Sequence, residues 1–237
     1  MTTLVFVGPT LAADEARARL PSATIAPPIA VGELLAITKR RGVRRIAIID
    51  GYFERMAAVW HKEILLALER GIAVYGASSM GALRAAELAS FGMVGVGGIY
   101  QAFKRGELVA DDEVAVAHLP AEYGFRATSD ALVNLRDGIA RAPMLTAKTR
   151  KQLVELARAR FYRERSWAQL VTDARDVVPA NQLAALAAWP KPDRKADDAR
   201  LLLKRLARDP IVRPAKLRVP RTWALRQLET IVGDGVR

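Results

Sequence analysis

The stretch Ile72-Ala73-Val74-Tyr75-Gly76-Ala77-Ser78-Ser79-Met80-Gly81-Ala82 decides the fold, because it predicts a strand that turns directly into a helix. Its first residues are apolar, as in a buried strand, and a helical pattern continues to residue 89. A serine between small residues at such a turn presents its hydroxyl above a sheet, and the helix that follows supplies free backbone N–H groups for an anion. We therefore predict an α/β fold with a functional serine at this turn.

Short β-branched runs alternate with runs of helical period over the first 140 residues. The predicted strands are residues 4–7, 23–26, 45–49, 72–76 and 114–117, and the predicted helices between them are residues 12–20, 31–41, 56–70 and 82–91. Repeated units of this length predict a mostly parallel sheet that is covered by helices, an α/β architecture of the Rossmann or flavodoxin type.

The chain changes character at about residue 145, where the strand pattern ends. Residues 148–163 and 198–207 carry apolar side chains at helical spacing, with lysine and arginine between them. Of the net charge of +12, +11 falls on residues 145–237. We therefore expect two domains, an α/β core over residues 1–144 and a basic helical region over residues 145–237.

Composition excludes several classes of site. The chain has no cysteine, which excludes disulfides, thiolate metal sites and a cysteine nucleophile, and its two histidines do not favour a structural zinc. We predict no metal, ATP or NAD cofactor, since Gly8-Pro9-Thr10 is not a Walker loop and no GxGxxG follows a strand. No run is long and apolar enough for a membrane span or a signal peptide, so we expect a cytoplasmic protein with no membrane contact.

Three polar residues end predicted strands, at the edge where parallel sheets bind ligands: Asp50, Ser79 and His118. Ser79 is the predicted nucleophile, in the serine position of the motif, and Ser78 is the alternative one residue earlier. The competing interpretation is that one of these serines caps the following helix.

A serine nucleophile needs a base, and the sequence leaves three candidates. His118 and His61 are the only histidines, and Lys62 is the base of a possible serine–lysine pair. Asp50 is expected to orient a histidine as the third member of a triad, although Asp-Gly is also a common turn pair.

The predicted substrate- or anion-binding residues lie around the serine turn and the first strand's end. Backbone N–H groups of Met80 and Gly81 would stabilise an oxyanion. Arg84 lies three residues before Glu87, so it either forms a helix ion pair with Glu87 or holds an acidic carrier terminus. The remaining members of this set are Ser78, Gly8, Thr10 and Tyr52. The acidic turn Asp111-Asp112-Glu113 is interpreted as a solvated turn, with Mg²⁺ binding as the alternative.

Six stretches together resemble a known family: residues 5–11, 50–53, 59–64, 76–88, 111–118 and 133–136. In this order, with the serine motif and the motif His61-Lys62-Glu63, they resemble the TfuA-like family over the α/β part, and the resemblance fades in the basic tail. It implies an accessory partner of a YcaO-type enzyme, which converts a backbone amide of a precursor peptide or protein into a thioamide. It further implies sulfur delivery by hydrolysis of a thiocarboxylated, ThiS-like carrier protein.

Three functions follow as hypotheses. The first is this accessory hydrolase or activator, and the alternative is a non-catalytic subunit that docks on the YcaO-type enzyme. A nucleic-acid binder is the weakest, because the basic region has no helix-turn-helix or aromatic stacking motif. Its arginines are better suited to an acidic protein or peptide.

Overall fold

The computed structural model describes residues 2–53 and 56–234, which form two compact units. We call Met1–Leu108 with Ala196–Arg237 the sheet unit and Val109–Lys195 the helical unit. The strands are β1 (Thr2–Phe6), β2 (Ala23–Ala26), β3 (Val43–Ile48), β4 (Ala73–Ala77) and β5 (Val94–Val96).

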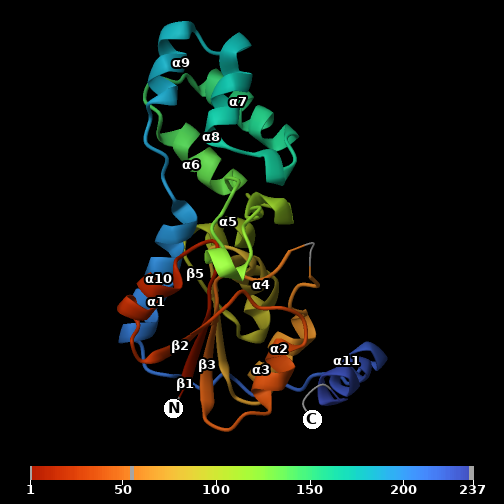
Figure 1. Ribbon diagram of the computed structural model, residues 1–237. Coiled ribbons are helices and arrows are strands. Elements are labelled where there is room, and N and C mark those ends of the chain that lie inside the picture. Colours follow the sequence, from red (N-terminus) through yellow and green to blue (C-terminus); the bar gives the residue numbers. More distant parts are fainter. Residues whose placement is uncertain (1, 54–55, 235–237) are drawn as a thin grey trace. The chain divides into compact units, whose positions relative to one another are not determined.

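The helices are distributed over both units (Figure 1). The helices of the sheet unit are α1 (Ala13–Arg19), α2 (Glu33–Thr38), α3 (His61–Glu69), α4 (Met80–Leu88), α5 (Gly98–Lys104), α10 (Arg194–Arg208, whose first two residues lie in the helical unit) and α11 (Trp223–Asp234). The helical unit contains α6 (Leu132–Arg141), α7 (Ala147–Ala159), α8 (Trp167–Asp173) and α9 (Ala180–Ala187). Single 3-10 turns are η1 (Ala89–Phe91), η2 (Asp111–Glu113), η3 (Ala121–Tyr123), η4 (Tyr162–Glu164) and η5 (Ala174–Asp176).

The five strands form one all-parallel sheet in the order β2-β1-β3-β4-β5. The predicted α/β fold class is therefore confirmed. This 2-1-3-4-5 order is the doubly wound order of flavodoxin-like folds, in which the chain changes direction across the sheet between β1 and β3. Ligands in such folds bind beyond the carboxyl ends of the strands at this switch point.

One predicted strand is wrong and one real strand was missed. Residues 114–117 form no strand, although Val114 and Ala115 are buried. Their apolar character comes from burial in the helical unit, where the Val114 carbonyl accepts a 2.7 Å hydrogen bond from the Lys195 ammonium instead of a strand partner. The fifth strand is β5, three residues long, whose central Gly95 lies against the Tyr100 ring and leaves only two side chains to signal a strand.

Helices cover both faces of the sheet, as predicted. Alternate strand residues form a core with α1 and α10, which lie side by side in Figure 1. The buried strand members of this core are Val5, Ala47, Ala73, Tyr75, Ala77 and Val96, and the buried helix members are Ala16, Ala196, Ala199, Leu202, Leu203 and Leu206. On the opposite face α3 and α4 pack on β4, and α2 packs on α3.

The C-terminal segment returns to the sheet unit, so the compact units divide the chain at positions other than 144/145. Helix α10 buries Leu202 and Leu206 against the sheet, and its Asp198 accepts hydrogen bonds from the N–H groups of Gly98 (2.9 Å) and Ile99 (2.8 Å) at the start of α5. Charge did not reveal this return, because α10 is basic outside and apolar inside.

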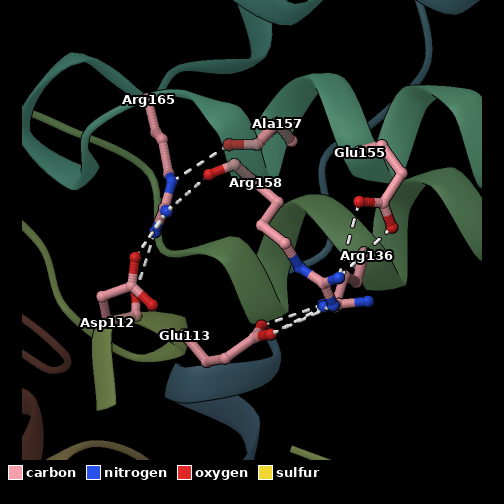
Figure 2. Close-up of polar contacts among 7 residues, drawn as sticks. All are labelled: Asp112, Glu113, Arg136, Glu155, Ala157, Arg158 and Arg165. Carbon is pink, nitrogen blue, oxygen red and sulfur yellow. Dashed lines mark hydrogen bonds and ion pairs between the residues drawn. The ribbon is translucent and has the colours of Figure 1, made fainter. Parts of the chain in front are cut away.

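Arginines organise the helical unit around a core built from α6, α7, α8 and α9. The Arg165 side chain, 2% exposed, donates to the carbonyls of Ala157 (3.1 Å) and Asp112 (2.9 Å) and to the Asp112 carboxylate (2.6 Å). Glu113 pairs with Arg136 through two hydrogen bonds of 2.8 and 2.6 Å (Figure 2). The turn predicted to be solvated is therefore partly buried and held by arginine, with two of its carboxylates engaged.

Candidate active site

The turn between β4 and α4 is the most strained backbone in the candidate site. Ser78 is fully buried and has φ = +69°, and the Ser79 N–H donates to the Ala77 carbonyl at 2.9 Å. Together these features define a γ-turn of the positive-φ type, which is rare and strained. Residues held in such conformations cluster at functional sites, so the strain points to this turn.

Two glycines allow the turn to sit tightly on the sheet. A Cβ atom at Gly76 would overlap the Gly81 carbonyl, and a Cβ atom at Gly81 would overlap the Ile48 carbonyl. The Gly81 N–H donates to the Ile49 carbonyl at 3.3 Å, which commits it to this packing. Met80 is the first residue of α4, where a backbone N–H has no acceptor within the helix.

Ser79 occupies the N-cap position of α4 but its side chain makes no capping hydrogen bond. The residue is only 8% exposed, and its carbonyl accepts the first helical hydrogen bonds, from Ala82 (2.9 Å) and Leu83 (3.3 Å). The hydroxyl of Ser79 thus lies at a helix start without the structural use that such a serine usually has.

Asp50 holds the loop after β1 at the switch point. Its carboxylate is 1% exposed and accepts hydrogen bonds from the Gly8 N–H (2.8 Å), the Thr10 N–H (3.1 Å) and the Thr10 hydroxyl (2.6 Å). The two N–H groups predicted to bind a substrate anion therefore bind the protein's own carboxylate.

His61 pairs with α4 at the end opposite Ser79. Its Nε2 lies 2.8 Å from the Glu87 carboxylate, which also accepts a 2.8 Å hydrogen bond from Arg84. This contact with Glu87 confirms the predicted Arg84–Glu87 helix ion pair. Arg84 also donates a hydrogen bond to the Val59 carbonyl at 3.1 Å. Because a helix rises 1.5 Å per residue, Glu87 lies roughly 12 Å along α4 from Ser79. His61 is held beside that end of the helix, and Lys62 follows it partly exposed.

His118 belongs to the helical unit, so its pairing with Ser79 of the sheet unit stays a prediction. It does not end a strand, as the sequence suggested, but forms a single antiparallel bridge to Ala127. Its Nδ1 lies 2.8 Å from the Leu119 carbonyl oxygen, and its ring meets the Phe125 ring edge-on at 5.8 Å.

The loop after β3 borders the serine turn. A Cβ atom at Gly51 would lie 2.9 Å from the Met80 side chain, and the Tyr52 N–H donates to the Ile29 carbonyl at 3.0 Å. Burial raises the pKa of the Tyr52 phenol, and the charge of Glu33 adds to the rise. The phenol therefore stays protonated at neutral pH and can donate a hydrogen bond.

Glu63 has a role that the sequence analysis did not assign. It is fully buried and accepts hydrogen bonds from the Trp60 N–H (3.0 Å) and the Gly32 N–H (2.8 Å), which joins the starts of α2 and α3. Burial raises its pKa, and the backbone hydrogen bonds oppose that rise. Its place three residues after Trp60 is the capping-box spacing, which could have revealed this role.

Over residues 2–53 and 56–234, no group of three or more His, Asp or Glu side chains is arranged to hold a metal ion. No helix in the same residues has the length and apolar composition to cross a bilayer.

The chain was compared with known proteins. Residues 50–166 match the family model described as TfuA-like protein. These residues belong to the TfuA-like family. No curated protein matches the chain. The TfuA-like match includes the serine turn, both histidines and the arginine-bound acidic turn, and it supports a role in the TfuA/YcaO system.

Proposed function

We propose that this TfuA-like protein assists a YcaO-type enzyme in backbone thioamide formation, and that its β4–α4 turn hydrolyses the thiocarboxylate of a ThiS-like carrier protein. The observation that carries the proposal is the serine pair at the turn. Ser78 has a strained backbone, and Ser79 has a buried hydroxyl that does not cap its helix. Both features are typical of a serine kept for chemistry rather than for stability.

The proposed reaction proceeds in two steps. The serine oxygen attacks the thiocarboxylate carbon, its proton passes to a base, and the C–S bond breaks to release the sulfur as hydrogen sulfide. Water then hydrolyses the serine ester, which gives a carboxylate on the carrier and restores the hydroxyl. The Met80 N–H supports the oxyanion in both steps, in the place the sequence assigned to Met80 and Gly81 together.

The base is chosen among His118, His61 and Lys62. His118 is the first choice, because His61 pairs with Glu87 far along α4 and would have to leave that partner. Asp50 supports the site by fixing the loop after β1 rather than by orienting a histidine.

A second candidate function is a non-catalytic subunit that docks on the YcaO-type enzyme. The partners of His61 and Asp50 favour it, since neither residue is paired as a member of a triad. In that case the serine turn binds an acidic terminus without cleaving it.

One experiment separates the two functions. The purified protein is incubated with a thiocarboxylated ThiS-like carrier, with and without a YcaO-type enzyme, and intact mass follows the replacement of sulfur by oxygen on the carrier. Conversion by the protein alone supports the hydrolase. Faster thioamide formation by the YcaO-type enzyme with the carrier left unconverted by the protein alone supports the docking subunit.

A further inference from the structure

A groove with a volume of about 640 Å³ lies between α1 and α10 on the sheet unit, away from the serine turn. We call it the α1–α10 groove. Its charged lining is Arg19, Asp197, Arg200, Lys204 and Arg208. Four of these five side chains are basic, which makes the groove a positively charged channel.

The helical period of α10 explains how the groove forms. Leu202, Leu203 and Leu206 point into the core beneath the sheet. Residues on the opposite stripe, spaced three and four apart, face outward beside α1, and Leu201 among them is 49% exposed. The groove therefore contains an apolar side chain between cationic ones.

Part of the charge is already paired and fixes the groove walls. Glu15 of α1 accepts hydrogen bonds from Arg19 (2.8 Å) and Arg200 (2.8 Å), and Arg200 also pairs with Asp197 at 3.2 Å. The contact between Glu15 and Arg200 ties α1 to α10 beside the groove.

The rest of the charge is available. Lys204 and Arg208 are exposed, and their side chains form no hydrogen bond or ion pair with the residues that the structure describes. They lie one helical turn apart on α10, a spacing that suits two acidic side chains of one extended chain.

We propose that the α1–α10 groove binds an acidic polypeptide segment that carries an apolar side chain. Carboxylates of the segment pair with Lys204 and Arg208, and its apolar side chain covers Leu201. A nucleic acid fits less well, because the carboxylates of Glu15 and Asp197 stand at the groove and, among the described residues, no aromatic ring lines it.

The test measures fluorescence anisotropy of a labelled synthetic peptide made of glutamates with one central leucine. The double variant Lys204→Glu, Arg208→Glu should weaken binding by about tenfold or more. The matched control is Lys148→Glu, Lys151→Glu on α7, which changes the charge equally at two exposed lysines and should change affinity by less than about twofold. Equal losses in both double variants would show general charge attraction and overturn the proposal.

Two further measurements sharpen the test. Leu201→Ala should weaken binding of the leucine peptide but not of an all-glutamate peptide, and equal effects on both contradict the apolar contact. The neutral variant Lys204→Gln, Arg208→Gln should lose affinity in the same direction with less risk to the fold, and unchanged affinity overturns the proposal. Tighter binding of a labelled single-stranded RNA, lost in the same variant, would assign the groove to nucleic acid instead.

Discussion

The starts of α4 and α5 follow the neighbouring strands β4 and β5, yet the protein treats them differently. At α5, Asp198 from α10 binds the N–H groups of Gly98 and Ile99. At α4, two serines precede the helix, one strained and the other without a capping bond. A helix start carries partial positive charge, so an internal carboxylate at α5 completes a structural contact. We propose that the serines at α4 provide chemistry instead.

The loop after β1 extends this comparison. There Asp50 binds the backbone N–H groups of Gly8 and Thr10, as Asp198 does at α5. The protein thus supplies its own anion at two strand ends. The contrast supports the proposal that the start of α4, and not the switch point between β1 and β3, binds the substrate carbonyl.

The largest effect is expected from Gly81→Ala, which would disturb the packing at the start of α4. The new Cβ atom overlaps the Ile48 carbonyl, so α4 must move away from β3. We expect a loss of about 3 kcal/mol or more in the free energy of unfolding, measured by denaturant titration. The control is Gly106→Ala, where nothing lies within 4 Å of the added atom and only the positive φ of +72° opposes it. A loss no greater than that of the control would show that the turn is loosely packed.

The next effect is on activity rather than stability. Ser79→Ala should lower thiocarboxylate hydrolysis by about a hundredfold or more, on the order of 3 kcal/mol of barrier. Its unfolding free energy should hardly change, because the side chain makes no capping bond. Intact-mass assays measure the rate of thiocarboxylate hydrolysis, and denaturant titration measures the unfolding free energy. Activity lost only in Ser78→Ala would move the nucleophile to the strained residue, and full activity in both variants would leave the docking subunit as the function.

At α5 we expect the reverse pattern from Asp198→Ala, which should lower stability and leave activity unchanged. It leaves the N–H groups of Gly98 and Ile99 without an acceptor, and we expect a loss of about 2 kcal/mol in unfolding free energy with hydrolysis unchanged. The adjacent Asp197→Ala is the matched control, since within the described part of the chain the Asp197 side chain forms only an exposed ion pair with Arg200, worth about 0.5 kcal/mol. Equal losses in the two variants would mean that Asp198 is not the structural anion described here.

These contrasts also mark what the sequence could reveal. Strand and helix periods predicted the parallel sheet and the serine turn, because a buried strand such as β4 is apolar throughout and a glycine-rich turn follows it. They failed for residues 114–117, where the same apolar pattern reflects burial among helices. They also failed for β5, which has three residues and a central glycine.

The candidate site was predicted as a set of residues but not as a set of partners. Motif spacing pointed to Asp50, His61 and Ser79, yet only the folded chain shows that Asp50 binds the β1 loop and that His61 binds Glu87. The positive φ of Ser78 was invisible, since no propensity predicts a strained serine. Such contacts depend on which elements meet in space, which a local pattern does not encode.

The smallest effect concerns how α10, and with it Asp198, is held to the sheet. Two arginines lower the pKa of Glu15 from 4.5 to about 2, chiefly through the hydrogen bond from Arg200 and next through the one from Arg19. Because the folded state lowers the pKa of Glu15, the ionised pair stabilises the protein at pH values above the unfolded pKa of 4.5, and this contribution is lost as the pH falls through about 2.

Denaturant titrations between pH 5 and 2 should show a steeper loss of stability in the wild type than in Glu15→Gln. At neutral pH the variant should lose about 0.5 kcal/mol, since the pair is partly exposed. A variant with the same acid sensitivity as the wild type would show that Glu15 does not help to hold α10. In that case the buried leucines of α10 alone would keep Asp198 in position at the start of α5.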